Sequence, residues 1–200
     1  PHPDLGAPPS PPEPAQTPAR AQDLYGAATP ALRTKHRHGS AFQSRLPPYD
    51  EALPRFELSL FHDWLCGTHL GLEFSDAAER QWQECCDRLV DNALNQPQVF
   101  VHRDYHSRNL MVTDVDNPGI LDFQDAVEGP LTYDLVSLLK DCYICWPASQ
   151  RRQWALELYA DLESPLREQI SASQLRRCFD LIGVQRHLKA AGIFERLKHR

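Results

Sequence analysis

Three polar residues near the middle of the chain have the types and the spacing that phosphoryl transfer needs. Asn109 follows Asp104 by five positions, and Asp122 follows it by 18. A carboxylate can accept the proton of an attacking hydroxyl, and carboxylate and amide oxygens are the ligands that Mg²⁺ prefers. We therefore predict that Asp104 is the catalytic base and that Asn109 and Asp122 hold the Mg²⁺ of a nucleoside triphosphate such as ATP.

Short apolar runs on both sides of these residues predict the strands that position them. Residues 98–101 lead into the loop, residues 110–112 lead out of it, and residues 119–121 precede Asp122. Between the last two runs lie Asp, Asn, Pro and Gly residues, which favour turns. We expect a hairpin that returns Asp122 beside Asn109.

The loop, the Asp-Phe pair at 122–123 and the segment 129–135 resemble the aminoglycoside phosphotransferase family of small-molecule kinases. In that family a comparable aspartate braces the catalytic loop, so the resemblance implies a structural role for Asp134. We expect His102 to pack and hydrogen-bond beneath the same loop rather than take part in chemistry. Gln124 stands where protein kinases carry glycine, and this departure indicates a small hydroxyl compound as the substrate.

Within the family, residues 46–50, 99–112 and 122–126 are similar to the bacterial anomeric amino-sugar kinases. Those enzymes use ATP to phosphorylate N-acetylmuramate and N-acetylglucosamine at the 1-hydroxyl in cell-wall recycling. The resemblance covers residues 46–200 and implies ATP and Mg²⁺ as cofactors and a small sugar as the partner. Aminoglycosides and small amino alcohols are the alternative acceptors.

The chain divides into two parts by composition. Residues 1–18 hold eight of the 17 prolines, and no sustained apolar period follows before residue 46. Such a segment cannot bury enough surface to fold, so we expect residues 1–45 to be disordered. Its basic run at 33–38 is interpreted as a solvated tail, and His36 and His38 lack partners at metal-ligand spacing. Residues 46–200 are expected to form a kinase-like catalytic lobe.

The expected lobe belongs to the α+β class and is mostly helical. Asp76 with Glu79, and Ser171 with Gln174, are candidate capping boxes at helix starts. The expected buried helical faces are Leu53, Phe56, Leu60 and Trp64; Ala78, Trp82, Cys85, Leu89 and Ala93; Ala155, Leu158, Tyr159 and Leu162; and Leu175, Phe179 and Ile182.

Charge and cysteine content limit the possible partners. The net charge of −6 argues against general nucleic-acid binding, and no apolar run of 18 residues predicts a membrane span. Cys142 and Cys145 form a lone C-x-x-C, for which we expect buried, reduced thiols on a helix. The cytoplasm is therefore the expected compartment. No sequence signal for an oligomer interface, such as a heptad seam, is present.

Two elements of a complete kinase are not found upstream of the loop. Neither a Gly-rich strand-turn-strand over the phosphates nor a strand lysine that pairs with them is recognisable. We expect the chain to hold only the carboxy-terminal lobe, with its carboxy terminus cut as well, which leaves the nucleotide-binding residues unassigned. The alternative to a kinase is an inactive catalytic-lobe remnant that serves as a binding or regulatory module.

Overall fold

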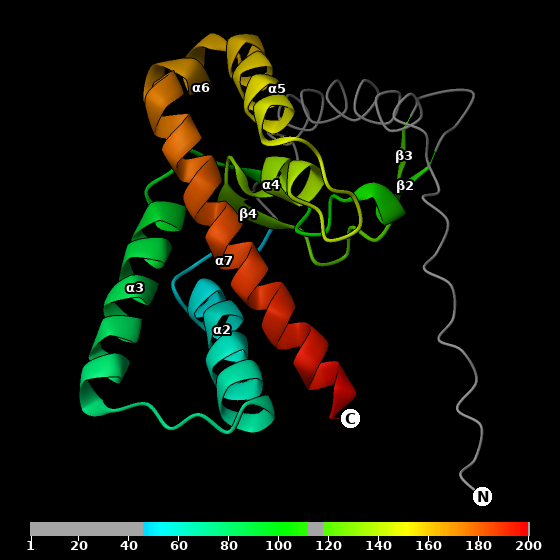
Figure 1. Cartoon of the computed structure of the whole chain (residues 1–200). Coiled ribbons are helices and arrows are strands. Elements are labelled where there is room, and N and C mark those ends of the chain that lie inside the picture. The colour runs from blue at the N-terminus through cyan, green and yellow to red at the C-terminus, as the bar shows by residue number, and fades with distance from the viewer. Residues whose placement is uncertain (1–45, 112–117, 200) are drawn as a thin grey trace, which may run out of the picture.

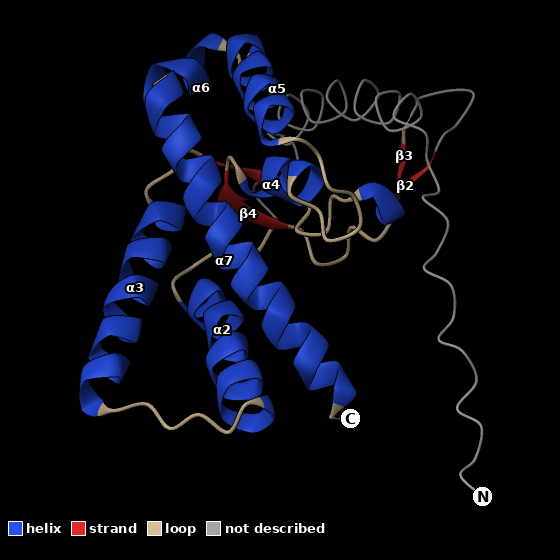
Figure 2. Ribbon diagram, viewed as in Figure 1, coloured by secondary structure: helices blue, strands red, loops and turns tan. Residues whose placement is uncertain are grey.

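The computed structural model describes residues 46–111 and 118–199 of the 200-residue chain. The described part is mostly helical with two small sheets (Figures 1 and 2), which confirms the α+β class. The expected disordered segment 1–45 and the hairpin turn lie outside the described residues. The helices are α2 (Ala52–Leu60), the π-helix η2 (Phe61–His69), α3 (Asp76–Leu94), the 3₁₀ turn η3 (Ser107–Asn109), α4 (Tyr133–Leu139), α5 (Ala148–Asp161), α6 (Ser164–Gln169) and α7 (Ala172–Lys198).

Both sheets are antiparallel pairs. β1 (Gln98–Val101) pairs with β4 (Val127–Pro130), and a parallel bridge from Pro48 to Glu128 extends that pair. β2 (Leu110–Met111) pairs with β3 (Gly119–Ile120), which confirms the predicted hairpin. The catalytic loop therefore starts from one sheet and ends in the other.

The helix α7 organises the rest of the lobe. It contacts α2, η2, α3, α4 and α5, and Figure 1 shows it running diagonally past α4 and α2. Its apolar residues Leu175, Phe179 and Ile182 are buried as predicted, and they join the main core with residues of β1, α4 and α5. A smaller core of Leu58, Cys86, Leu89 and Val90 lies between α2 and α3.

The helix starts were predicted with mixed success. Ser171 and Gln174 form the expected capping box at the start of α7. The box proposed for Asp76 with Glu79 is wrong, because Ser75 is the N-cap of α3 and its hydroxyl accepts from the Ala78 N–H. Serine takes the cap because its short hydroxyl reaches the free backbone N–H groups of the first turn.

The buried faces of α2 and α3 also differ from the prediction. Phe56 is 55% exposed whereas the neighbouring Glu57 is 1% exposed. In α3 it is Cys86 rather than Cys85 that is buried. Glu57 is buried because Arg103, Lys189 and two tyrosine hydroxyls bind its carboxylate in the interior. The face of α2 that carries Glu57 therefore points inward, and Phe56 is left facing solvent.

The C-x-x-C segment lies outside any helix. α4 ends at Leu139, and Cys142 and Cys145 are both exposed and free. The prediction of buried helical thiols is therefore wrong in burial, although both thiols are unpaired. Within the described residues, no helix combines the length and the apolar character needed to cross a lipid bilayer.

Candidate active site

The loop that carries Asp104 begins with a strained backbone. Arg103 directly after β1 has φ 73°, a left-handed conformation that costs a non-glycine residue about 1 kcal/mol. Asp134 accepts the His102 N–H at 2.7 Å and the Arg103 N–H at 3.0 Å on its two carboxylate oxygens. The Arg103 carbonyl accepts from Arg186 Nη1 at 2.9 Å. These bonds come from α4 and α7, so the two helices hold the strained residue that precedes Asp104.

Asn109 and Asp122 lie at the open end of the β2–β3 hairpin. The Leu121 N–H donates to the Asn109 carbonyl at 3.0 Å, and Asp122 follows at once with φ 65°. The Asn109 amide nitrogen donates to the Asp104 carbonyl at 2.9 Å, which ties the predicted base to one predicted metal ligand. The hairpin thus brings together the residues that the sequence places up to 18 positions apart.

The remaining oxygens of Asn109 and Asp122 suit a hard cation. Since the Asn109 nitrogen is used by Asp104, its Oδ1 is left as the acceptor, and the exposed Asp122 carboxylate accepts only one bond, from Gln124 Nε2 at 2.7 Å, among the described residues. Mg²⁺ keeps several waters and binds through one or two protein oxygens together with substrate phosphates. These residues therefore have the donor set for Mg²⁺.

His102 lies beneath the loop. It is 1% exposed, its Nε2 is 2.9 Å from the Leu121 carbonyl, and its ring packs edge-on against Tyr105. The imidazole thus connects the start of the catalytic loop to Leu121, which lies between β3 and Asp122. Ser107 in the loop also donates its hydroxyl to Asp141 at 2.8 Å, which joins the loop to the segment after α4.

A cavity of about 230 Å³ opens on Asp104. One wall is polar and comes from the loop and the segment after α4, with His106, Asp141 and Tyr143. The opposite wall comes from α7, where cationic residues give way to an apolar strip: Arg186, His187, Lys189, Ala190, Ile193, Phe194 and Leu197. A small hydroxyl compound in this cavity would lie against the predicted base.

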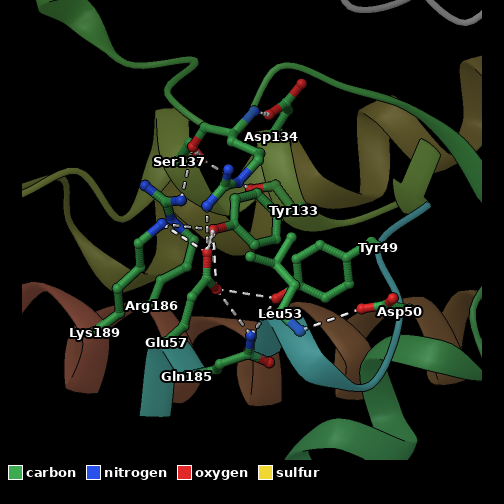
Figure 3. Close-up of polar contacts among 11 residues, drawn as sticks. Tyr49, Asp50, Leu53, Glu57, Tyr133, Asp134, Ser137, Gln185, Arg186 and Lys189 are labelled. Atoms are coloured by element: carbon green, nitrogen blue, oxygen red, sulfur yellow. Dashed lines mark hydrogen bonds and ion pairs between the residues drawn. The ribbon is translucent and has the colours of Figure 1, made fainter. Parts of the chain in front are cut away.

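A buried carboxylate beneath the loop was not predicted from the sequence. Glu57 of α2 accepts from Arg103 Nη2 at 3.0 Å and from Lys189 Nζ at 2.8 Å. The hydroxyls of Tyr49 and Tyr133 donate to it at 3.0 and 3.1 Å. Figure 3 shows these side chains converging on the Glu57 carboxylate from the segment before α2, from α4 and from α7.

The charges of this cluster are unequal. Burial raises the pKa of Glu57, but Lys189 and Arg103 outweigh that effect and lower the pKa to about 2. Glu57 is therefore ionised, and with Asp104 it faces three cations, Arg103, Arg186 and Lys189. Among the residues that line the cavity itself, Lys140, Arg186 and Lys189 are basic and Asp104 and Asp141 are acidic, so the lining has one more basic than acidic side chain.

The family follows from a comparison of the whole sequence with known proteins. The model of the phosphotransferase enzyme family matches residues 4–172, which includes the catalytic loop, the hairpin and α4. The chain belongs to this family. The match confirms the resemblance seen in the motifs, and it also takes in most of segment 1–45.

Three relatives of this phosphotransferase chain bear the same name, N-acetylmuramate/N-acetylglucosamine kinase. The protein from Pseudomonas aeruginosa is 45% identical over 188 residues, 92% of this chain and 54% of its own length. The Pseudomonas putida protein is 48% identical over 183 residues, 90% of this chain and 52% of its own. The Neisseria meningitidis protein is 43% identical over 160 residues, 78% of this chain and 46% of its own length. The chain spans about half the length of the curated relatives that it matches.

The structure thus places all five predicted site residues around one loop: Asp104, Asn109, Asp122, His102 and Asp134. The residues that sequence reasoning missed are Glu57, Arg186 and Lys189, which approach the loop from helices far away in the chain. Arg103 and Lys189 lie 46 and 132 positions from Glu57. The local signal was an acidic residue between apolar neighbours, Phe56 and Leu58, and such a residue is normally assigned to the surface.

Proposed function

We propose that this chain carries the catalytic lobe of an ATP-dependent kinase that phosphorylates the anomeric hydroxyl of N-acetylmuramate or N-acetylglucosamine. The observation that carries the proposal is the cavity on Asp104, whose carbonyl accepts a hydrogen bond from Asn109 at the start of the β2–β3 hairpin. The family provides the reaction class, and the shared name of the relatives provides the sugars.

In this proposal Asp104 accepts the proton of the sugar hydroxyl as that oxygen attacks the terminal phosphate. Asn109 and Asp122 hold Mg²⁺, which neutralises charge on the triphosphate when bound. His102 and Asp134 keep the loop in place through the hydrogen bonds described above. Positioning accounts for most of the catalysis in phosphoryl transfer, so a loop fixed at several points serves this chemistry.

The excess positive charge beside Asp104 indicates a preference between the two sugars. N-acetylmuramate carries a lactyl carboxylate and N-acetylglucosamine carries no charge. Lys189 and Arg186 line the cavity, and an acceptor carboxylate there would balance the extra cation. We therefore expect a lower KM for N-acetylmuramate. Since N-acetylmuramate is a cell-wall sugar, the product belongs to cell-wall recycling, and free cysteines fit a reducing cytoplasm.

The test is formation of sugar 1-phosphate from MgATP and either sugar. The assay is run on the purified 200-residue chain and on the same chain joined to a complete amino-terminal lobe. Asp104→Asn removes the base and should lower kcat about a hundredfold or more. Asp91→Asn, the same change at an exposed position of α3, should leave kcat unaltered.

Each result has a distinct meaning. Product that depends on Asp104 supports the kinase, and equal turnover of Asp104→Asn rejects the base assignment. If neither form makes product from either sugar, aminoglycosides and amino alcohols are tried as acceptors. A folded chimera that phosphorylates none of them would identify the lobe as a noncatalytic remnant.

A further inference from the structure

Two histidines and a glutamate meet at the end of the lobe away from the catalytic loop. His69 is the last residue of η2, and Glu195 and His199 lie at the end of α7. Residues four apart on a helix share a face, so Glu195 and His199 both point toward η2. One ligand atom from each of the three lies within 4.8 Å of the others.

The contact between Glu195 and His69 is unusual for an ion pair. Glu195 is 9% exposed, and its Oε2 lies 3.1 Å from His69 Nδ1 but accepts no hydrogen bond. A neutral imidazole nitrogen and a carboxylate oxygen at this separation can both offer lone pairs to one cation. Ligands at about 2.0–2.1 Å from one tetrahedral cation are about 3.3 Å apart, close to the separation observed.

The elements that carry the three residues are held firmly together. A Cβ at Gly192 would lie 2.3 Å from the Leu60 carbonyl carbon, so α7 and the α2–η2 junction touch backbone to backbone. Lys198 binds the other carboxylate oxygen of Glu195 at 2.6 Å, so Oε2, which faces His69, is the oxygen that can act as the ligand. The three ligands are therefore largely preorganised for a cation.

From this geometry we propose that His69, Glu195 and His199 bind a divalent transition-metal ion of the zinc type. Two imidazoles and one carboxylate suit Zn²⁺ and leave a fourth position for water, whereas Mg²⁺ prefers oxygen ligands. The ion would join the end of η2 to the end of α7. Glu195 and His199 do not line the cavity on Asp104, so this site is separate from the proposed kinase chemistry.

The test is isothermal titration of the chelator-stripped 200-residue chain with ZnCl₂. We expect one equivalent to bind, and a loss of at least tenfold in affinity in both His69→Ala and His199→Ala. His187→Ala removes an exposed histidine of the same helix outside the cluster and should bind as the unaltered chain does. Circular dichroism establishes that each variant is folded, and Zn²⁺ should raise the melting temperature of the unaltered chain and of His187→Ala only.

Cysteines are the competing zinc ligands, so a second variant separates them. Cys142→Ser with Cys145→Ser should keep the one-equivalent binding. The Co²⁺ complex of the unaltered chain should likewise lack a thiolate charge-transfer band. Binding that disappears in the cysteine variant but survives in His199→Ala would overturn the proposal, as would the absence of any stoichiometric binding.

Discussion

At the residue scale, Arg103 combines a strained backbone with an anchored side chain. Its φ of 73° suits glycine, yet its guanidinium binds the buried Glu57. We infer that the ion pair with Glu57 offsets the backbone strain of Arg103 and fixes this residue, which directly precedes Asp104. Two substitutions separate these effects, because glycine removes both the strain and the anchor whereas alanine removes only the anchor.

We expect both variants to lose stability, because Glu57 loses one of its two cationic partners and keeps only Lys189. Arg103→Gly should nevertheless be more stable than Arg103→Ala by roughly 0.5–1 kcal/mol, because the left-handed penalty of about 1–2 kcal/mol, which only alanine keeps, exceeds the roughly 0.4–1 kcal/mol that the freer unfolded chain costs glycine. Urea denaturation measures the difference. At an unstrained position the order is reversed, since glycine gains about 0.4–1 kcal/mol more freedom on unfolding. A more stable alanine variant would therefore contradict the strained backbone.

Some residues of the site can be predicted from their neighbours in the sequence, and others depend on contacts with distant parts of the chain. Asp104, Asn109 and Asp122 could be predicted because their spacing and the turn residues between the strands are local in the sequence. Glu57, Arg186 and Lys189 could not, because a charged side chain becomes a buried one only through partners that tertiary folding brings together. One sequence contains no local pattern for such a cluster.

At the element scale, the packing of α7 depends on Gly192. The Cβ of any other residue would overlap the backbone carbonyl of Leu60, the last residue of α2. Gly192→Ala should therefore lower the free energy of unfolding by about 1–3 kcal/mol, despite the higher helix propensity of alanine of about 1 kcal/mol.

Gly67→Ala is the matched control for this substitution. Gly67 also lies in a helix, η2, but a Cβ there meets only the His62 carbonyl at an ordinary 3.5 Å. Urea unfolding should show Gly67→Ala to be neutral or slightly stabilised. Equal free energies of unfolding for the two variants would mean that α7 can move away from α2 without a loss of stability.

Elements were predicted best where a local rule decides the outcome. The serine cap of α7 and the β2–β3 hairpin follow from side chains a few positions apart. Which side of α2 and of α3 is buried depends instead on the elements that pack against each helix. The prediction therefore chose Phe56 and Cys85, whereas the adjacent residues Glu57 and Cys86 are the buried ones. The pairing of β1 with β4 joins residues around 30 positions apart, and no local turn signals it.

At the scale of the whole molecule, Glu57 connects parts of the lobe that are distant in the sequence. Its partners come from the segment before α2, the catalytic loop, α4 and α7. Loss of the Glu57 charge should therefore lower the free energy of global unfolding, rather than only favour local opening of one segment.

The pH dependence of unfolding tests this connection. The folded-state pKa of Glu57 is about 2 and its ordinary value is 4.5. Between these values the unfolded chain binds a proton that the folded chain excludes, so stability is fully present above pH 4.5 and falls as the pH decreases toward 2. The contribution at neutral pH is about 3 kcal/mol.

Glu57→Gln should therefore be less stable than the unaltered chain at pH 6, and the gap should narrow steadily between pH 4.5 and pH 3. Urea unfolding at pH 6, 4 and 3 measures it. Glu84→Gln, the same change at an exposed position of α3, is the control. A Glu57→Gln gap that does not change with pH would mean that the carboxylate is not held ionised by Arg103 and Lys189. The catalytic loop would then be held mainly by its other contacts, among them those of Asp134, Ser137 and Arg186.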